Sequence, residues 1–243
     1  MLDVHPGATA QQNPLPAPGW LRRGILATVL LDVALVGGLA LRYRPFLAQP
    51  DAARYLLEPL ILLLLYAAFG VWLGTLRDAA HRIALKVGGA LGLLTGALWI
   101  INLTVETFTD LTGRVGLLAT APFLLGGFAL WGVAGAAAAW RAHNVRLGLL
   151  AALISATLCV LLTVTYGFLL PYIALPLLER TLAGDPDYLR SGWADLRAFT
   201  IANTFDAGFS HLLLAPLIAA LVGGLGGALA RGWLALVAAS RGA

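Results

Sequence analysis

Few residues in this sequence could carry out chemistry, and they lie far apart along the chain. The histidines are His5, His81, His143 and His211, and no two of them have the spacing of metal ligands on one helix. The single cysteine, Cys159, lies in an apolar run, where a free thiol behaves as a small hydrophobic side chain. No nucleophile motif, phosphate-binding loop or dinucleotide fingerprint occurs. We therefore expect no catalytic residue, no metal site, no cofactor and no enzymatic activity.

The most unusual position is Asp32, an acidic residue inside an apolar run. It follows Arg23 by nine residues, which is about 13 Å along a helix. An ionised carboxylate is costly at that depth in a membrane, so we expect Asp32 to be uncharged or to face a wet cavity. One interpretation is a proton or cation site. The other is a neutral carboxyl group that forms a hydrogen bond to a neighbouring helix, at Thr95, Ser155 or Thr157.

A second group of polar residues lies near the ends of apolar segments. Asn102 and Glu106 are four residues apart, so they share one face of a helix. Residues at similar depth in other segments are candidates for a polar mouth on the outer side together with this pair. The full set is Asn102, Glu106, Glu58, His211, Asn203 and Asp206. The alternative interpretation is ordinary solvation of helix ends.

The composition indicates what kind of protein must position these residues. Of the 243 residues, 60% are hydrophobic and only 12% are charged, whereas a soluble domain is about 25% charged. Apolar stretches of roughly 20 residues recur, each long enough to cross a lipid bilayer. We therefore predict an all-α, polytopic membrane helical bundle. A soluble enzyme, a disulfide scaffold and a nucleic-acid-binding protein are excluded.

Six transmembrane helices are predicted, in a single domain over residues 21–243. The predicted spans are 24–41, 55–76, 83–105, 115–140, 147–170 and 209–230. Residues 1–20, which are rich in proline and amide side chains, are predicted to form a disordered cytoplasmic tail. Pro171 and Pro176 are expected to end or kink the fifth span.

The only long connection, 179–208, is predicted to be an outer loop. In it, the apolar side of a short amphipathic helix is indicated by Leu189, Trp193, Leu196 and Thr200, which recur at helical spacing.

Basic residues predict the orientation. Nine of them flank the spans on one side, against four in the two short loops of the other side. The nine are Arg22, Arg23, Arg77, Arg82, Lys86, Arg141, Arg146, Arg231 and Arg241; the four are Arg42, Arg44, Arg54 and Arg114. The positive-inside rule then places both termini in the cytoplasm. Because arginine, alanine and glycine are abundant, we expect a bacterial protein in the inner membrane.

The spans have features of three parallel helical-hairpin repeats. Pro59, Pro122 and Pro216 each lie in the first turns of an even-numbered span, where a missing N–H costs little. The alternative is that apolar helices resemble one another by composition. Small residues recur four apart on two spans and favour close helix packing, within the chain, in a homo-oligomer or with a partner subunit. These are Gly88, Gly92 and Gly96, and Gly223 and Gly227.

Short motifs resemble uncharacterised six-span bacterial membrane proteins. They are Leu98-Trp99, Glu106-Thr107-Phe108, Asn203-Thr204 and Ser210-His211-Leu212. The resemblance implies the architecture alone, with no activity or functional residue. The sequence therefore favours a protein without catalysis that acts through helix packing with itself or a partner. The alternative is a small-solute or proton-coupled permease that uses Asp32 and the outer polar mouth.

Overall fold

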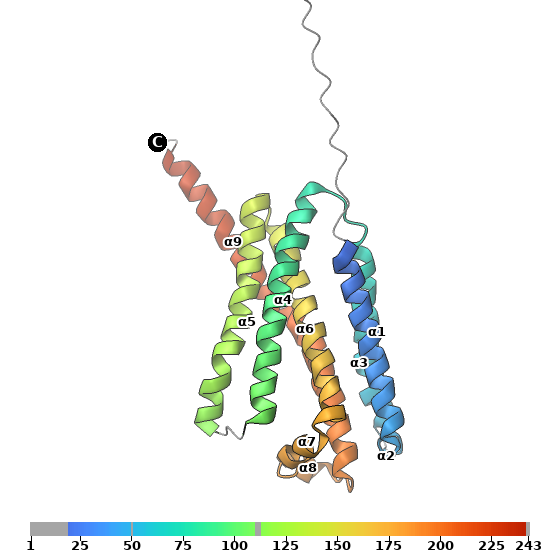
Figure 1. Ribbon diagram of the computed structural model, residues 1–243. Coiled ribbons are helices and arrows are strands. Elements are labelled where there is room, and N and C mark those ends of the chain that lie inside the picture. Colours follow the sequence, from blue (N-terminus) through green and yellow to red (C-terminus); the bar gives the residue numbers. More distant parts are fainter. Residues whose placement is uncertain (1–18, 50, 110–112, 242–243) are drawn as a thin grey trace, which may run out of the picture.

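A computed structural model describes residues 19–49, 51–109 and 113–241, and helices are the only regular secondary structure over these ranges. The predicted tail at 1–20 lies outside the described residues except for Gly19 and Trp20, which begin the first helix. The helices, shown in Figure 1, are α1 (Gly19–Arg42), α2 (Arg44–Leu47), α3 (Ala52–Leu73), α4 (Ala79–Phe108), α5 (Gly113–Ala142), α6 (Val145–Ile173), α7 (Leu175–Leu182), α8 (Pro186–Ser191) and α9 (Leu196–Arg241).

Six of these helices are long and apolar enough to cross a membrane, which confirms the predicted number of spans. They are α1, α3, α4, α5, α6 and α9. The shortest, α3, has 22 residues and so is about 33 Å long, which matches the apolar thickness of a bilayer. The all-α helical bundle is confirmed, and it indicates a multi-pass membrane protein.

The long helices alternate in direction between two ends of the bundle. The end that carries α2, α7 and α8 is at the bottom of Figure 1 and is called the lower end. The start of α1 and the end of α9 lie at the opposite, upper end. At the lower end α4 ends and α5 begins, and the connections from α3 to α4 and from α5 to α6 are at the upper end.

The core of the bundle surrounds α6, which is by far the most buried of the six spans. It packs against α1, α4, α5 and α9, while α3 packs against α1 and α9 on one side. Apolar side chains occur on all sides of α6, as expected for a helix that is enclosed by other helices. The fold is therefore organised around one central helix rather than around a central channel.

Local sequence signals explain where α6 begins and ends. The side chain of Asn144 accepts a hydrogen bond from the backbone N–H of Arg146 and so caps the start of α6. Between Pro171 and Pro176 the chain turns, since α6 ends at Ile173 and α7 begins at Leu175. Proline therefore ends the fifth span, as its missing N–H predicts.

The connection at 179–208 differs from the predicted amphipathic helix. Leu189 belongs to α8, which ends where Gly192 adopts a left-handed conformation with φ of 72°. Leu196 and Thr200 belong to the next helix, α9. Helical spacing across 189–200 was misleading, because a glycine with positive φ stops one helix before the next begins. The last part of the expected loop, 196–208, forms the first turns of α9.

Pro216 requires a different explanation from the one its sequence position gave. Since α9 begins at Leu196, this proline lies deep inside a helix of 46 residues and not in its first turns. Proline has no N–H, so the carbonyl oxygen of Leu212 loses its intrahelical donor. The hydroxyl group of Tyr66, on α3, donates to that oxygen over 2.8 Å. A side chain from another helix thus replaces the missing backbone hydrogen bond.

Candidate functional site

Asp32 lies in the contact between α1 and α6 and is fully buried. Its Oδ1 atom is 2.6 Å from the hydroxyl oxygen of Thr165. The expected partners Thr95, Ser155 and Thr157 are wrong, because the rotation of α6 about its axis directs Thr165 to α1 instead. The residue pattern of a single helix does not indicate how that helix is rotated relative to its neighbours.

The geometry around Thr165 favours an uncharged Asp32. The Thr165 hydroxyl oxygen is also 2.8 Å from the carbonyl oxygen of Leu161, and a hydroxyl group has one proton to donate. If Asp32 carries a proton, it donates to Thr165, which donates to Leu161, and both contacts are satisfied. Asp32 Oδ2 has no hydrogen-bond partner in the described part of the chain. This arrangement is that of a sealed contact between two helices, and Asp32 lines neither of the two cavities described below.

Several residues of the predicted polar mouth come together at the lower end. Asn102 and Glu106 on α4 and Asn203 and His211 on α9 line one cavity of about 350 Å³. Residues of α5, α6 and α7 complete it. Asn102 Nδ2 donates a hydrogen bond to Glu106 Oε1 over 2.8 Å. The i, i+4 spacing on α4 therefore produces the contact that it suggested.

Glu58 and Asp206 do not belong to this cavity. Glu58 accepts a hydrogen bond from Arg54 over 3.1 Å, and Arg54 also lies 3.9 Å from Asp206. These three residues form a separate charged group between α3 and α9. The prediction that placed them in one mouth with Asn102 was wrong, because α3 packs on the side of α9 away from α4. Similar depth in the membrane does not bring residues together unless their helices are neighbours.

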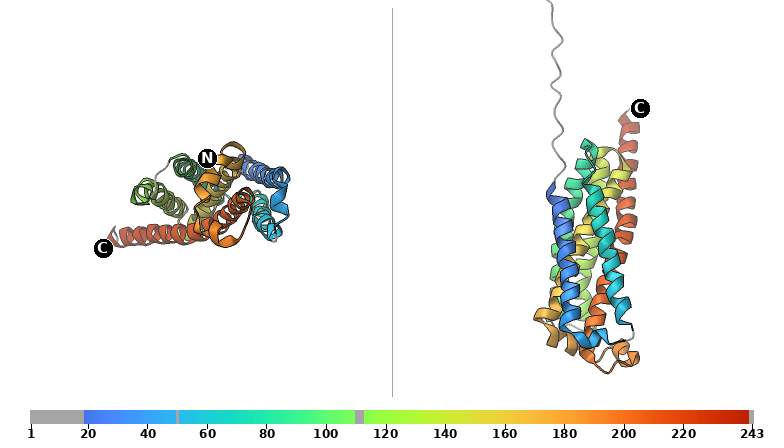
Figure 2. Two further views of the ribbon diagram at one scale, coloured as in Figure 1. Left: turned by 90° about the horizontal axis from the view of Figure 1, so that it is seen from below. Right: turned by 90° about the vertical axis from the view of Figure 1, so that its right-hand side faces the viewer.

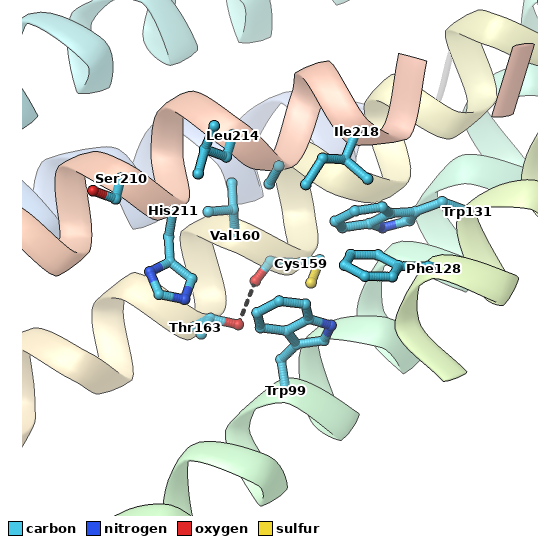
Figure 3. A pocket seen from close by; sticks show the side chains of 11 residues that line it. Trp99, Phe128, Trp131, Cys159, Val160, Thr163, Ser210, His211, Leu214 and Ile218 are labelled. Carbon is cyan, nitrogen blue, oxygen red and sulfur yellow. Dashed lines mark hydrogen bonds between the residues drawn. The ribbon is translucent and has the colours of Figure 1, made fainter. Parts of the chain in front are cut away.

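A second cavity, of about 150 Å³, lies deeper and adjoins the first. The two share Trp99, Thr163 and His211 as lining residues. Figure 3 shows that Trp99, Phe128 and Trp131 form one wall of the deeper cavity, with His211 and Leu214 across from it. The rings of Trp99 and Trp131 are stacked with centroids 6.4 Å apart, and His211 lies edge-on at 5.8 Å from Trp99. We call the two adjoining cavities the lower cleft.

The lower cleft lies below a tight crossing of α5 and α9. At the upper end, Gly135 packs so closely on Gly223 that a Cβ atom at Gly135 would overlap the Gly223 carbonyl group. Gly132 and Gly226 meet in the same way, and Gly227 lies beside this crossing. Toward the lower end, α5 and α9 diverge (Figure 1). Glycine contacts at one end and larger side chains at the other thus open a V-shaped space between these helices.

The other small-residue face packs inside the chain. A Cβ atom at Gly88 would lie 2.9 Å from Cβ of Ile154, and one at Gly92 would lie 2.8 Å from the Ser155 carbonyl oxygen. Gly96 faces Cys159 and Leu162. All three glycines therefore serve the contact between α4 and α6.

The aromatic wall of the cleft was not found from the sequence. Phe128 and Trp131 are three residues apart and follow Gly126 and Gly127, and a Cβ atom at Gly127 would overlap the Trp99 indole. A bulky aromatic residue opposite a glycine pair on the next span is the signal that could have indicated this packing. Within the described ranges, no group of three His, Cys, Asp or Glu residues is placed to hold a metal ion.

Comparison with known proteins adds nothing to this geometry: no protein-family model, no curated protein and no solved structure matches the chain.

Proposed function

We propose that this integral membrane protein acts without catalysis, by packing against another membrane component that the lower cleft holds between α5 and α9. The observation that carries the proposal is the cleft, which has polar residues at the lower end and an aromatic interior. Asn102 and Trp131 are buried in it, whereas Glu106 and His211 are exposed. A space that is open on one side and graded from polar to apolar suits a molecule that comes from the bilayer.

The small-residue faces do not serve an external partner in this proposal. Such faces drive association of membrane helices because they permit close approach. Here Gly88, Gly92 and Gly96 contact α6, and Gly223 contacts α5 and α6. A bound membrane component therefore has to pack elsewhere, and the space between the diverging lower halves of α5 and α9 is the place that we assign to it.

The proposal includes a location. Nine basic residues near the upper end, against four in the two short loops of the lower end, support an orientation with both termini in the cytoplasm. The lower cleft then opens toward the outer leaflet. The arginine-rich, lysine-poor composition supports the inner membrane of a bacterium as the host membrane.

The alternative is a small-solute or proton-coupled permease. It is favoured by one observation, namely that two adjoining cavities extend from the lower end into the membrane. It is disfavoured by Asp32, which lies in the α1–α6 contact and lines neither cavity. A permease would have to use the lower cleft without Asp32. Solute or proton flux in liposomes that disappears on Ala207→Phe, which fills the lower cleft, would select the permease.

Site-specific photo-crosslinking tests the proposed function. A photoreactive amino acid at Leu124, which lines the lower cleft, is compared with one at Leu118, which is 74% exposed on the same helix. In native membranes we expect a discrete adduct at Leu124 and only bulk lipid at Leu118. Ala207→Phe, which fills the same cavity, should remove the Leu124 adduct. Identical adducts at both positions, unchanged by Ala207→Phe, would refute the proposal.

A further inference from the structure

The lower cleft contains a buried hydrogen-bond acceptor that has no donor. Asn102 is 6% exposed, and its amide nitrogen donates to Glu106. Its Oδ1 atom has no hydrogen-bond partner within the described residues. An unsatisfied buried carbonyl oxygen costs free energy, so this atom favours a ligand that brings an N–H or O–H group.

Glu106 differs from the other two glutamates of the chain, which are paired with arginines. Glu58 contacts Arg54 at 3.1 Å, and Glu179 contacts Arg197 at 2.6 Å. Glu106 has no basic partner among the residues that the structure describes, and it accepts only the Asn102 amide hydrogen bond. Its carboxyl group therefore lies at the entrance of the cleft without a paired cation among the described residues.

His211 presents a further acceptor. Its Nδ1 atom lies 2.7 Å from the carbonyl oxygen of Ala207, which can only accept, so Nδ1 carries the proton. In the neutral ring Nε2 is then an acceptor. The imidazole lies beside Thr163 (Figure 3), and both residues line the two cavities where these adjoin. Within the part of the chain that the structure describes, no arginine or lysine lines either cavity.

The inner part of the cleft is apolar and elongated. Trp99 lies seven residues before Glu106 on α4, which places its ring about 10 Å deeper in the membrane. Along α9, the lining extends from Asn203 to Ile218, a distance of about 22 Å at helical rise. Aromatic faces here offer contact for an apolar chain and also attract a cation.

We propose that the lower cleft binds an amphiphile with a primary ammonium head group and an apolar tail, and that this ligand lacks a phosphate group. The head group lies at Asn102 and Glu106, where it supplies the missing donor and the missing positive charge. The tail lies along Trp99, Phe128 and Trp131. Because no arginine or lysine among the described residues lines the cleft, a phosphate next to the amine would have no permanently charged cation to contact. This inference rests on the proposed function and specifies the chemistry of the bound component.

Binding of tritiated dodecylamine to the purified full-length protein in a non-ionic detergent tests the proposal. The competitors are dodecanol, dodecanoate and lysophosphatidylethanolamine, which share an apolar tail and differ in the head group. We expect saturable binding that unlabelled dodecylamine displaces and that each competitor displaces at least about tenfold less effectively. Glu106→Gln should weaken binding at least about tenfold, because it removes the charge and keeps the shape. Glu58→Gln, the same substitution outside the cleft, should have no effect.

The outcomes separate this inference from the proposed function. If dodecanol or dodecanoate competes as well as dodecylamine, or if Glu106→Gln binds normally while Ala207→Phe does not, the cleft holds amphiphiles without preference for ammonium. The inference then fails and the proposed function stands. If lysophosphatidylethanolamine binds best, the exclusion of phosphate is wrong. If Ala207→Phe leaves all binding unchanged and the Leu124 crosslink is also absent, both proposals fail.

Discussion

The hydrogen bond from Tyr66 to the Leu212 carbonyl oxygen permits a test by a double-mutant cycle. Pro216 removes the intrahelical donor for that oxygen, and the Tyr66 hydroxyl group supplies another over 2.8 Å. Both groups are out of contact with solvent, since Tyr66 is 7% and Leu212 is 1% exposed. The perturbations are Tyr66→Phe, Pro216→Ala and the combination of the two.

The expected changes in the free energy of unfolding depend on whether the Leu212 carbonyl oxygen keeps a hydrogen-bond donor. Tyr66→Phe alone leaves the Leu212 oxygen without a donor, so the free energy of unfolding should fall by about 1–3 kcal/mol. In the Pro216→Ala protein, the N–H of residue 216 can reach the same oxygen, as in any regular helix. Tyr66→Phe then removes a hydrogen bond without stranding its acceptor, and the loss should be at most about 0.5–1.5 kcal/mol. The coupling energy should be about 1 kcal/mol.

Unfolding of the four proteins in detergent micelles measures this coupling. Tyr188→Phe serves as the control, because its hydroxyl group makes no hydrogen bond in the described structure, and it should leave stability unchanged. Independent mutations add within about 0.3–0.5 kcal/mol. Additivity within that range would refute the argument that Tyr66 replaces the backbone donor.

Three further predictions concern packing, the buried acid and orientation. Gly92→Ala places a Cβ atom 2.8 Å from the Ser155 carbonyl oxygen, so it should lower the free energy of unfolding by about 1–3 kcal/mol. The control is Gly37→Ala, whose Cβ atom meets nothing within 4 Å and which should be neutral or stabilising. Equal melting temperatures of the two variants would contradict the close contact of α4 and α6. Asp32→Asn should leave the melting temperature nearly unchanged, and Asp32→Leu should lower stability by about 0.5–1.5 kcal/mol because the contact with Thr165 is lost; a strongly destabilised Asp32→Asn would mean that the carboxyl group is ionised. On a Cys159→Ala background, a membrane-impermeant thiol reagent should label Ala183→Cys in intact cells and should not label Ala80→Cys, and the reverse pattern would invert the orientation.

Features set by local sequence could be predicted well. Hydropathy located the six spans, because a helix in lipid must satisfy its backbone internally and expose apolar side chains over a fixed length. The Asn102–Glu106 contact followed from their i, i+4 spacing on one helix. The end of α6 near Pro171 followed from the chemistry of proline.

Features set by the arrangement of helices could not be predicted. The choice of Thr165 rather than Thr157 as the partner of Asp32 depends on how α6 is rotated against α1. The separation of Glu58 from Asn102 depends on which helix is the neighbour of α4. The aromatic wall of the lower cleft depends on where α5 crosses α9, a crossing that glycines on both helices determine jointly. The pattern along one helix indicates how deep a residue lies in the membrane and which face of the helix it occupies. These contacts depend in addition on how two helices pack against each other.

The length of α9 has a mechanical consequence. Its 46 residues form one helix from the lower end to a tip that extends beyond the other helices (Figure 2). Gly223, at the crossing with α5, lies about 30 Å from Asn203 and about 27 Å from Arg241. The helix is thus a lever with nearly equal arms, and the glycine crossing is its fulcrum. Spreading of the helices at Asn203 would move the upper tip by a similar distance in the opposite direction.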